Sequence, residues 1–154
     1  MKRGISLVCL FLVSCTQANG ANCISFYVGK TLNNGEAFLS HYRLKDNVEN
    51  IELYSASFDL NKDGSLEYFY YLESPRFCGM KTGCDIGVYE FNDGDFRELI
   101  KYGLATYGRF DPRQKEHVDY VCVGDIENNG WAQLNIQDKR VFVYDGEYYV
   151  PEKR

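Results

Sequence analysis

The sequence predicts a mainly β domain, α+β at the margin, with about seven or eight antiparallel strands and one short N-terminal helix. Aromatic residues make up 16% of the chain, with 13 Tyr and 10 Phe, and these side chains favour the half-buried faces of sheets. Short apolar or alternating stretches recur between turns rich in Gly, Asn and Asp. A length of 154 residues suits one domain with a sizeable core.

The N-terminal residues have the pattern of an export signal. Lys2 and Arg3 precede an apolar run over residues 5–13, which is too short to span a bilayer as a permanent helix. Residues 12–15, Leu-Val-Ser-Cys, resemble the bacterial lipobox, and this resemblance implies a lipidated Cys15 sorted to the outer membrane. Cleavage among residues 18–21 by a general signal peptidase, which would leave a soluble periplasmic or secreted form, and an uncleaved anchor are the alternatives. The predicted organisation is a lipoprotein-type signal peptide over 1–14, a flexible tether over 15–22 and one β-rich domain over 23–154.

The first half of the predicted domain holds its helix. Residues 21–29 read as a first strand or a lead-in, and Asn33, Asn34 and Gly35 form a turn. Near-helical spacing of apolar residues then predicts a helix over 36–44. Strands follow over 51–58 and 66–72, separated by an acidic loop.

The second half is a series of strands and hairpins. An Asp93-Gly94 turn predicts a hairpin of residues 85–91 and 96–102, and Asp145-Gly146 predicts a closing hairpin of residues 139–144 and 147–150. Residues 120–123 and 131–136 read as strands, and residues 103–119 as an irregular strand followed by a polar loop around 111–116. The hexapeptides 59–64 and 125–130 align as a weak internal repeat, each opening a strand, which points to a duplicated plan.

The six Cys residues fall into two groups, two in the predicted N-terminal signal region and four in the predicted domain. Cys9 falls in the apolar run and Cys15 is the lipidation candidate, so four remain for an oxidising compartment. Four Cys allow three pairings. The short, Gly-flanked loop from Cys78 to Cys84 favours a local bridge, which leaves Cys23 to pair with Cys122. A zinc site is the rival interpretation, although the chain lacks paired C-x-x-C spacing.

The acidic loop carries the sharpest chemical pattern of the chain. Alternate oxygen-bearing residues of a tight loop turn inward, Gly64 permits the bend, and Ca²⁺ prefers such hard ligands. The predicted ligands are Asp59, Asn61, Asp63, Ser65 and Glu67. The pattern resembles the calcium loops of integrin-type repeats more than those of EF-hands, because Tyr70 stands where an EF-hand has its last Glu and a strand follows instead of a helix. An Asx-rich turn without metal is the alternative.

A wider resemblance covers residues 59–149. A D-x-N-x-D-G strand entry, a C-G…G-C loop, an aromatic hairpin and a closing Asp-Gly-x-Tyr turn are similar to a largely uncharacterised class of small exported bacterial proteins. The matching residues are Asp59, Asn61, Asp63, Gly64, Cys78, Gly79, Gly83, Cys84, Asp145, Gly146 and Tyr148. The resemblance implies export and a compact β fold, and it implies no activity.

The net charge and the motifs of the chain limit the classes of function that we expect. A net charge of −5 lacks the basic footprint of a nucleic-acid-binding protein, and neither His41 nor His117 lies in a metal or nucleophile motif. We therefore expect a non-catalytic periplasmic or envelope protein that binds a protein partner, most simply an inhibitor or immunity protein for a toxin or cell-wall hydrolase. Its only membrane contact would be the lipid at Cys15. A calcium-stabilised adhesion or envelope-structural module and a carboxylate-dependent hydrolase are the alternatives.

Overall fold

The computed structural model describes residues 22–28, 33–46, 52–74, 78–79, 83–101, 103–106, 111, 113, 120–126, 128–137 and 139–153. The predicted signal peptide, Cys15 and the tether up to residue 21 lie outside these residues. No helix within them is long and apolar enough to cross a bilayer.

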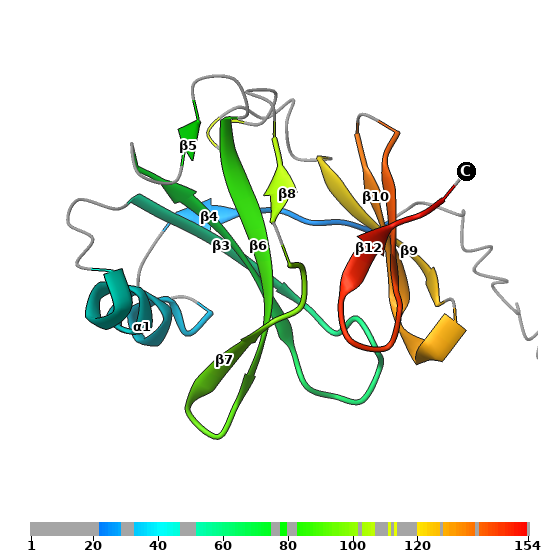
Figure 1. Ribbon diagram of the computed structural model, residues 1–154, viewed down its shortest axis with the longest axis horizontal. Coiled ribbons are helices and arrows are strands. Elements are labelled where there is room, and N and C mark those ends of the chain that lie inside the picture. Colours follow the sequence, from blue (N-terminus) through cyan, green and yellow to red (C-terminus); the bar gives the residue numbers. More distant parts are fainter. Residues whose placement is uncertain are drawn as a thin grey trace, which may run out of the picture.

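The fold is mainly β, as predicted, with two antiparallel sheets and one α-helix (Figure 1). The first sheet contains β2 (Tyr27–Val28), β3 (Glu52–Phe58), β4 (Glu67–Glu73), β5 (Cys78–Gly79), β6 (Gly83–Asn92), β7 (Asp95–Glu98) and β8 (Leu104–Ala105). The second contains β1 (Asn22–Cys23), β9 (Val121–Ile126), β10 (Ala132–Ile136), β11 (Val141–Tyr144) and β12 (Tyr149–Pro151). A 3₁₀ turn, η2 (Asn128–Gly130), joins β9 to β10.

The two sheets repeat one connectivity. In the first sheet β2 lies beside β3, and β3, β4, β6 and β7 then pair in succession. In the second sheet β1 lies beside β9, and β9 to β12 pair in succession. The hexapeptides of the predicted repeat connect the first two strands of each succession, and the two Asp-Gly turns connect the last two. The predicted duplication is thus present in the strand order.

The N-terminal segment of the described chain belongs to both sheets. Asn22 and Cys23 pair with Val123 and Cys122 of β9, and four residues later Tyr27 and Val28 pair with β3. Figure 1 shows this segment in blue, running from the second sheet to the edge of the first. A disulfide joins Cys23 to Cys122, 99 residues apart, and so fixes the segment to β9.

The second disulfide joins Cys78 to Cys84, which also face each other as partners of β5 and β6. Both bridges match the pairings expected from the sequence. The zinc interpretation is wrong, because all four sulfurs are consumed in disulfides.

The first sheet is covered on both faces because its strands alternate between two cores. Phe69 and Tyr71 of β4 face the second sheet and join the main core with Leu134 and Tyr149. Tyr70 and Leu72, from the alternate positions, face the helix α1 (Gly35–Asp46) in a smaller core. The ring of Phe38 on α1 stacks on that of Tyr70, with centroids 3.8 Å apart. The layers are therefore helix, first sheet and second sheet (Figure 1).

Most element bounds lie within two residues of the predicted ones, but β9 runs to Ile126, three residues past its predicted end. Other differences follow. The helix extends to Asp46, two residues past its predicted end. The segment predicted as strand over 96–102 is a strand only to Glu98 in β7, because the chain then turns inward and buries Leu99 and Ile100. The N-terminal stretch, predicted as one strand or a lead-in, is divided between two sheets.

Candidate functional site

The acidic loop connects β3 to β4 at one end of the first sheet. Its backbone takes left-handed conformations at Lys62, with φ of 59°, and at Gly64, with φ of 91°. An added Cβ on Gly64 would meet no atom within 4 Å, so glycine is favoured there by the backbone angle and not by space. The sequence prediction of a tight Asx-rich loop is confirmed at this level.

Side chains of the acidic loop accept hydrogen bonds from backbone N–H groups of the same loop. The Ser65 N–H donates a hydrogen bond to Asp63 Oδ1 at 2.7 Å. The Asp63 N–H donates to Asn61 Oδ1 at 3.0 Å, and the Gly64 N–H donates to Asp59 Oδ2 at 3.1 Å. Asp63 Oδ2 also accepts a hydrogen bond from the Asn61 amide at 2.8 Å. The bond from the Ser65 N–H favours the ionised form and lowers the pKa of Asp63. Ser65 contributes its backbone N–H to these contacts, and its side chain is exposed.

Glu67 differs from the other predicted ligands because it is almost completely buried. Only 1% of its surface is exposed, since it precedes Phe69 and Tyr71 on the face of β4 that meets the second sheet. Its Oε2 accepts the N–H of Leu60 at 2.6 Å. Burial is the main cause that raises the pKa of Glu67 to about 7; the Leu60 hydrogen bond lowers it, and the charges of Asp63, Asp59 and Glu90 raise it.

Two carboxylate oxygens at this site are shielded from solvent and have no hydrogen-bond partner: Asp59 Oδ1 and Glu67 Oε1. Within the part of the chain that the structure describes, no three His, Cys, Asp or Glu side chains converge as a ready-formed metal centre. The structure thus brings Asp59, Asn61 and Asp63 into one loop and sets Glu67 at its base.

The loop also contacts the second sheet. Leu60 is fully buried in the main core, and its C=O accepts the N–H of Ala132 on β10 at 2.8 Å. The Tyr149 hydroxyl in turn donates to the Ala132 C=O at 2.8 Å. Leu60 therefore links Glu67 of the first sheet to the backbone of the second.

The second copy of the hexapeptide has a different role. Asn129, which takes a left-handed φ of 65°, donates its side-chain amide to the Tyr144 C=O at 3.1 Å. That bond ties the η2 turn to β11.

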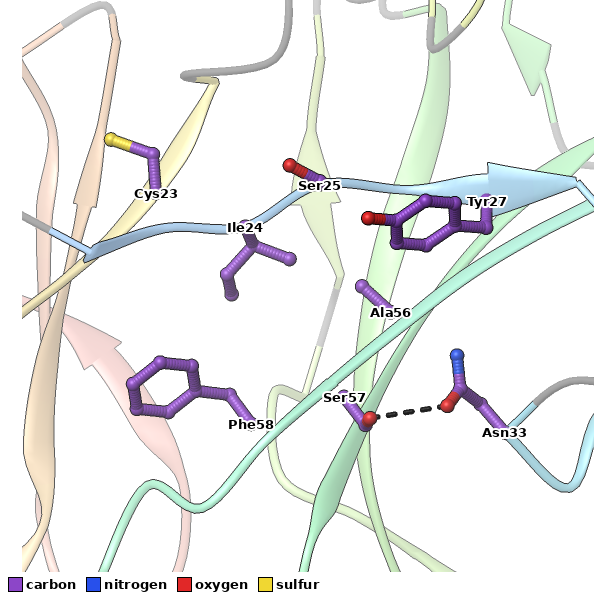
Figure 2. A pocket seen from close by; sticks show the side chains of 8 residues that line it. All are labelled: Cys23, Ile24, Ser25, Tyr27, Asn33, Ala56, Ser57 and Phe58. Atoms are coloured by element: carbon purple, nitrogen blue, oxygen red, sulfur yellow. Dashed lines mark hydrogen bonds between the residues drawn. The ribbon is translucent and has the colours of Figure 1, made fainter.

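A pocket of about 530 Å³ opens where the N-terminal segment crosses between the sheets. Its lining is free of charged side chains and consists of Cys23, Ile24, Ser25, Tyr27, Asn33, Ala56, Ser57 and Phe58. Figure 2 shows Ile24 and Phe58 at one end and Asn33 and Ser57 at the other, with the Tyr27 ring alongside. No sequence pattern indicated this pocket, because its two walls come from segments that pair only in the folded chain.

Hydrogen bonds fix one wall of the pocket. The Asn33 amide donates to Ser55 Oγ at 3.2 Å and accepts from Ser57 Oγ at 3.1 Å, and the Tyr70 hydroxyl donates to the Asn33 C=O. Asn33 itself takes a left-handed φ of 50°. The wall is thus held in place before any ligand arrives, which lowers the ordering cost of binding.

Two of the exposed large hydrophobic side chains in the described residues lie on β2, next to this pocket. Only three large hydrophobic side chains in the described residues are exposed: Tyr27 at 61%, Val28 at 60% and Leu66 at 46%. Tyr27 and Val28 form the edge strand β2, and Leu66 lies in the acidic loop. Comparisons with family models, with curated proteins and with solved structures found no match to this chain.

Proposed function

We propose that this chain is an exported, non-catalytic binding protein of the inhibitor or immunity type, which captures a protein partner through the surface formed by β2 and the adjoining pocket. The observation that carries the proposal is the exposed Tyr27, which lines an uncharged pocket and is followed on the same edge strand by the exposed Val28. Tyrosine is enriched in protein interfaces, because it offers a large ring and a hydroxyl at low entropic cost.

The partner would contribute an apolar side chain. The pocket is lined by apolar groups of Ile24, Ala56 and Phe58, with hydroxyl and amide groups of serines and Asn33 beside them. Such a lining suits an aliphatic or aromatic anchor from a loop of the partner. The two-residue strand β2 is too short to template a long added strand, so recognition depends on side chains and not on sheet extension. A net charge of −5 favours a basic partner, such as a cationic toxin or cell-wall hydrolase.

Substitution at the edge strand tests this surface. We expect Tyr27→Ala/Val28→Ser to weaken binding of the partner captured from an envelope extract by about 10- to 100-fold, the range for loss of a central interface anchor. Affinity is measured with the purified partner. Leu66→Ser is the matched control, because it removes the other exposed large hydrophobic side chain at a different site. A partner that binds the double variant as tightly as the wild type would refute the proposed surface.

Export with lipidation is the second part of the proposal. The lipobox-like residues 12–15 favour a mature protein that begins with lipidated Cys15, and the two disulfides are compatible with an oxidising compartment. Mass spectrometry of the mature N-terminus in a bacterial host is expected to show a diacylglyceryl-modified Cys15. An unmodified chain that begins after residue 18 or 20 would exclude the lipoprotein and leave export by the general pathway.

A further inference from the structure

The pocket lies at a fork between two backbone segments. β2 is only two residues long, so its pairing with β3 ends at Ser55. On the N-terminal side of that pair the segment leaves β3 for the second sheet, where the Ile24 N–H donates to the Val121 C=O at 2.8 Å. Figure 2 shows the segment and β3 diverging from Tyr27, with the side chains of Ile24 and Ala56 in the space between them. The fork therefore opens along the last residues of β3.

These last residues of β3, Ala56, Ser57 and Phe58, have one open edge. β4 pairs with them on one side. On the other side no strand of the described residues lies along them, because β2 is the neighbour of β3 there and its pairing stops at Ser55. Backbone N–H and C=O groups on such an edge can pair with an added strand. The pocket volume of about 530 Å³ is within the range of small-ligand sites and gives room for a short peptide segment.

The two sides of this edge differ in polarity, because the side chains of a strand alternate between its faces. Ala56 and Phe58 pack with the main core, as does Ile24. Ser57 points to the other face, where its Oγ donates to Asn33 Oδ1 at 3.1 Å. Within the described residues, no charged side chain lines the pocket. A charged ligand group would lose its hydration there without gaining an ionic partner, so an uncharged segment fits best.

We propose that an extended, uncharged segment of the protein partner adds to β3 at this fork, with apolar residues opposite Ala56 and Phe58 and a hydroxyl-bearing residue opposite Ser57. Directly opposite residues of paired strands share one face, so the apolar side chains would meet Ile24 and the hydroxyl would approach Asn33. The open edge belongs to β3 and not to β2, and it is short, so side chains still decide which segment is recognised. The inference rests on the proposed partner surface and specifies what enters its pocket.

Two capped peptides test the proposal on the full-length protein. The matched peptide, acetyl-Gly-Val-Thr-Val-Gly-amide, has the expected alternation, and acetyl-Gly-Thr-Val-Thr-Gly-amide reverses it. We expect the matched peptide to bind about 10-fold more tightly, because the reversed peptide places hydroxyl groups against the apolar side without a partner. Isothermal titration calorimetry measures both affinities.

Backbone methylation tests whether the peptide pairs as a strand. Methylating the peptide nitrogens one at a time should weaken binding about 3- to 10-fold at alternate positions only. The reason is that only alternate N–H groups of an added strand face β3. A peptide held by its side chains alone would show no such alternation, and that result would overturn strand addition.

Two variants decide whether the peptide occupies the fork. Ala56→Leu fills the apolar side and should weaken binding of the matched peptide by about 10-fold or more. Ser57→Val makes the other side apolar, so acetyl-Gly-Val-Val-Val-Gly-amide should then bind more tightly than the matched peptide, a reversal that loss of folding could not produce. Leu66→Ser, at a different exposed site, is the control and should bind the matched peptide as the wild type does.

The outcomes separate this inference from the proposed function. A matched peptide that does not bind, or that binds Ala56→Leu as tightly as the wild type, overturns strand addition. The partner surface would still stand if Tyr27→Ala/Val28→Ser weakened partner binding. If instead the peptide binds at the fork and that double variant binds the partner as tightly as the wild type, the partner surface is refuted and the strand-addition site is supported.

Discussion

Replacing both half-cystines in Cys23→Ala/Cys122→Ala should lower the free energy of unfolding by about 4–5 kcal/mol on the loop-entropy model. The bridge spans 99 residues, so its loss restores a large amount of conformational freedom to the unfolded chain. It also frees the N-terminal segment, which provides the first strand of the second sheet and one wall of the pocket. Urea unfolding followed by far-UV circular dichroism measures the change.

The other bridge provides the matched control. Cys78 and Cys84 are separated by six residues, so Cys78→Ala/Cys84→Ala should cost only about 2–3 kcal/mol on the same model. The loss of the first bridge should also reduce partner binding, whereas the loss of the second should not, because neither Cys78 nor Cys84 lines the pocket. A greater loss of stability in the Cys78→Ala/Cys84→Ala variant would show that loop length does not govern the effect of these bridges.

Glu67 should make the protein less stable as the pH rises from about 4.5 to about 7, by about 3 kcal/mol in total. Burial raises the pKa of Glu67 from its ordinary value of 4.5 to about 7 in the folded protein. Between these values the native state holds a proton that the unfolded state has released, so raising the pH favours unfolding. The stability that protonation of Glu67 contributes to the native state is complete below about pH 4.5 and lost above about pH 7.

Several ionisable side chains face Glu67. Asp59 and Asp63 belong to the loop, Glu90 is its register partner on β6, and the phenol of Tyr149 on β12 has its own pKa raised by burial and by the charge of Glu67. The Leu60 N–H is the opposing contact. Glu90 is itself paired with Arg97 at 2.7 Å, so this nearby cation is already engaged.

Glu67→Gln isolates the contribution of this residue. The variant cannot ionise at position 67, so the difference in unfolding free energy between wild type and variant should change by about 3 kcal/mol between pH 4.5 and pH 7. Urea unfolding in chelator at a series of pH values measures that difference. Glu147→Gln, in an exposed turn, should behave as the wild type. If the free energies of unfolding of wild type and Glu67→Gln differed by the same amount at every pH, Glu67 would have an ordinary pKa and the prediction would be wrong.

Local patterns were sufficient to predict the longer elements. Strands β3 and β4 and the Asp93-Gly94 hairpin were predicted within one or two residues at most ends, because alternation and turn residues lie next to one another in the chain. The Cys78–Cys84 bridge was predictable for the same reason, since both residues belong to one short loop.

Contacts between residues far apart in the chain could not be predicted from the sequence. The division of residues 22–28 between two sheets depends on partners about 30 and 100 residues away, which no local pattern records. Glu67 was predicted as a loop ligand, and its burial was missed although the signal was available. Counting back by two from Tyr71 and Phe69 places Glu67 on the core face of β4. The pocket had no such signal, because its walls meet only after folding.

The pairing of the N-terminal segment with β9 also determines the order in which the two sheets can be completed during synthesis. As the chain emerges amino end first, the first sheet is complete once residue 105 is available, whereas Asn22 and Cys23 wait for partners at Val123 and Cys122. Until then the inner face of the first sheet, with Phe69, Tyr71 and Val88, has no cover. A nascent chain halted near residue 106 would therefore be an adhesive, aggregation-prone intermediate. Chaperones that shield emerging chains should bind this protein most strongly over that interval.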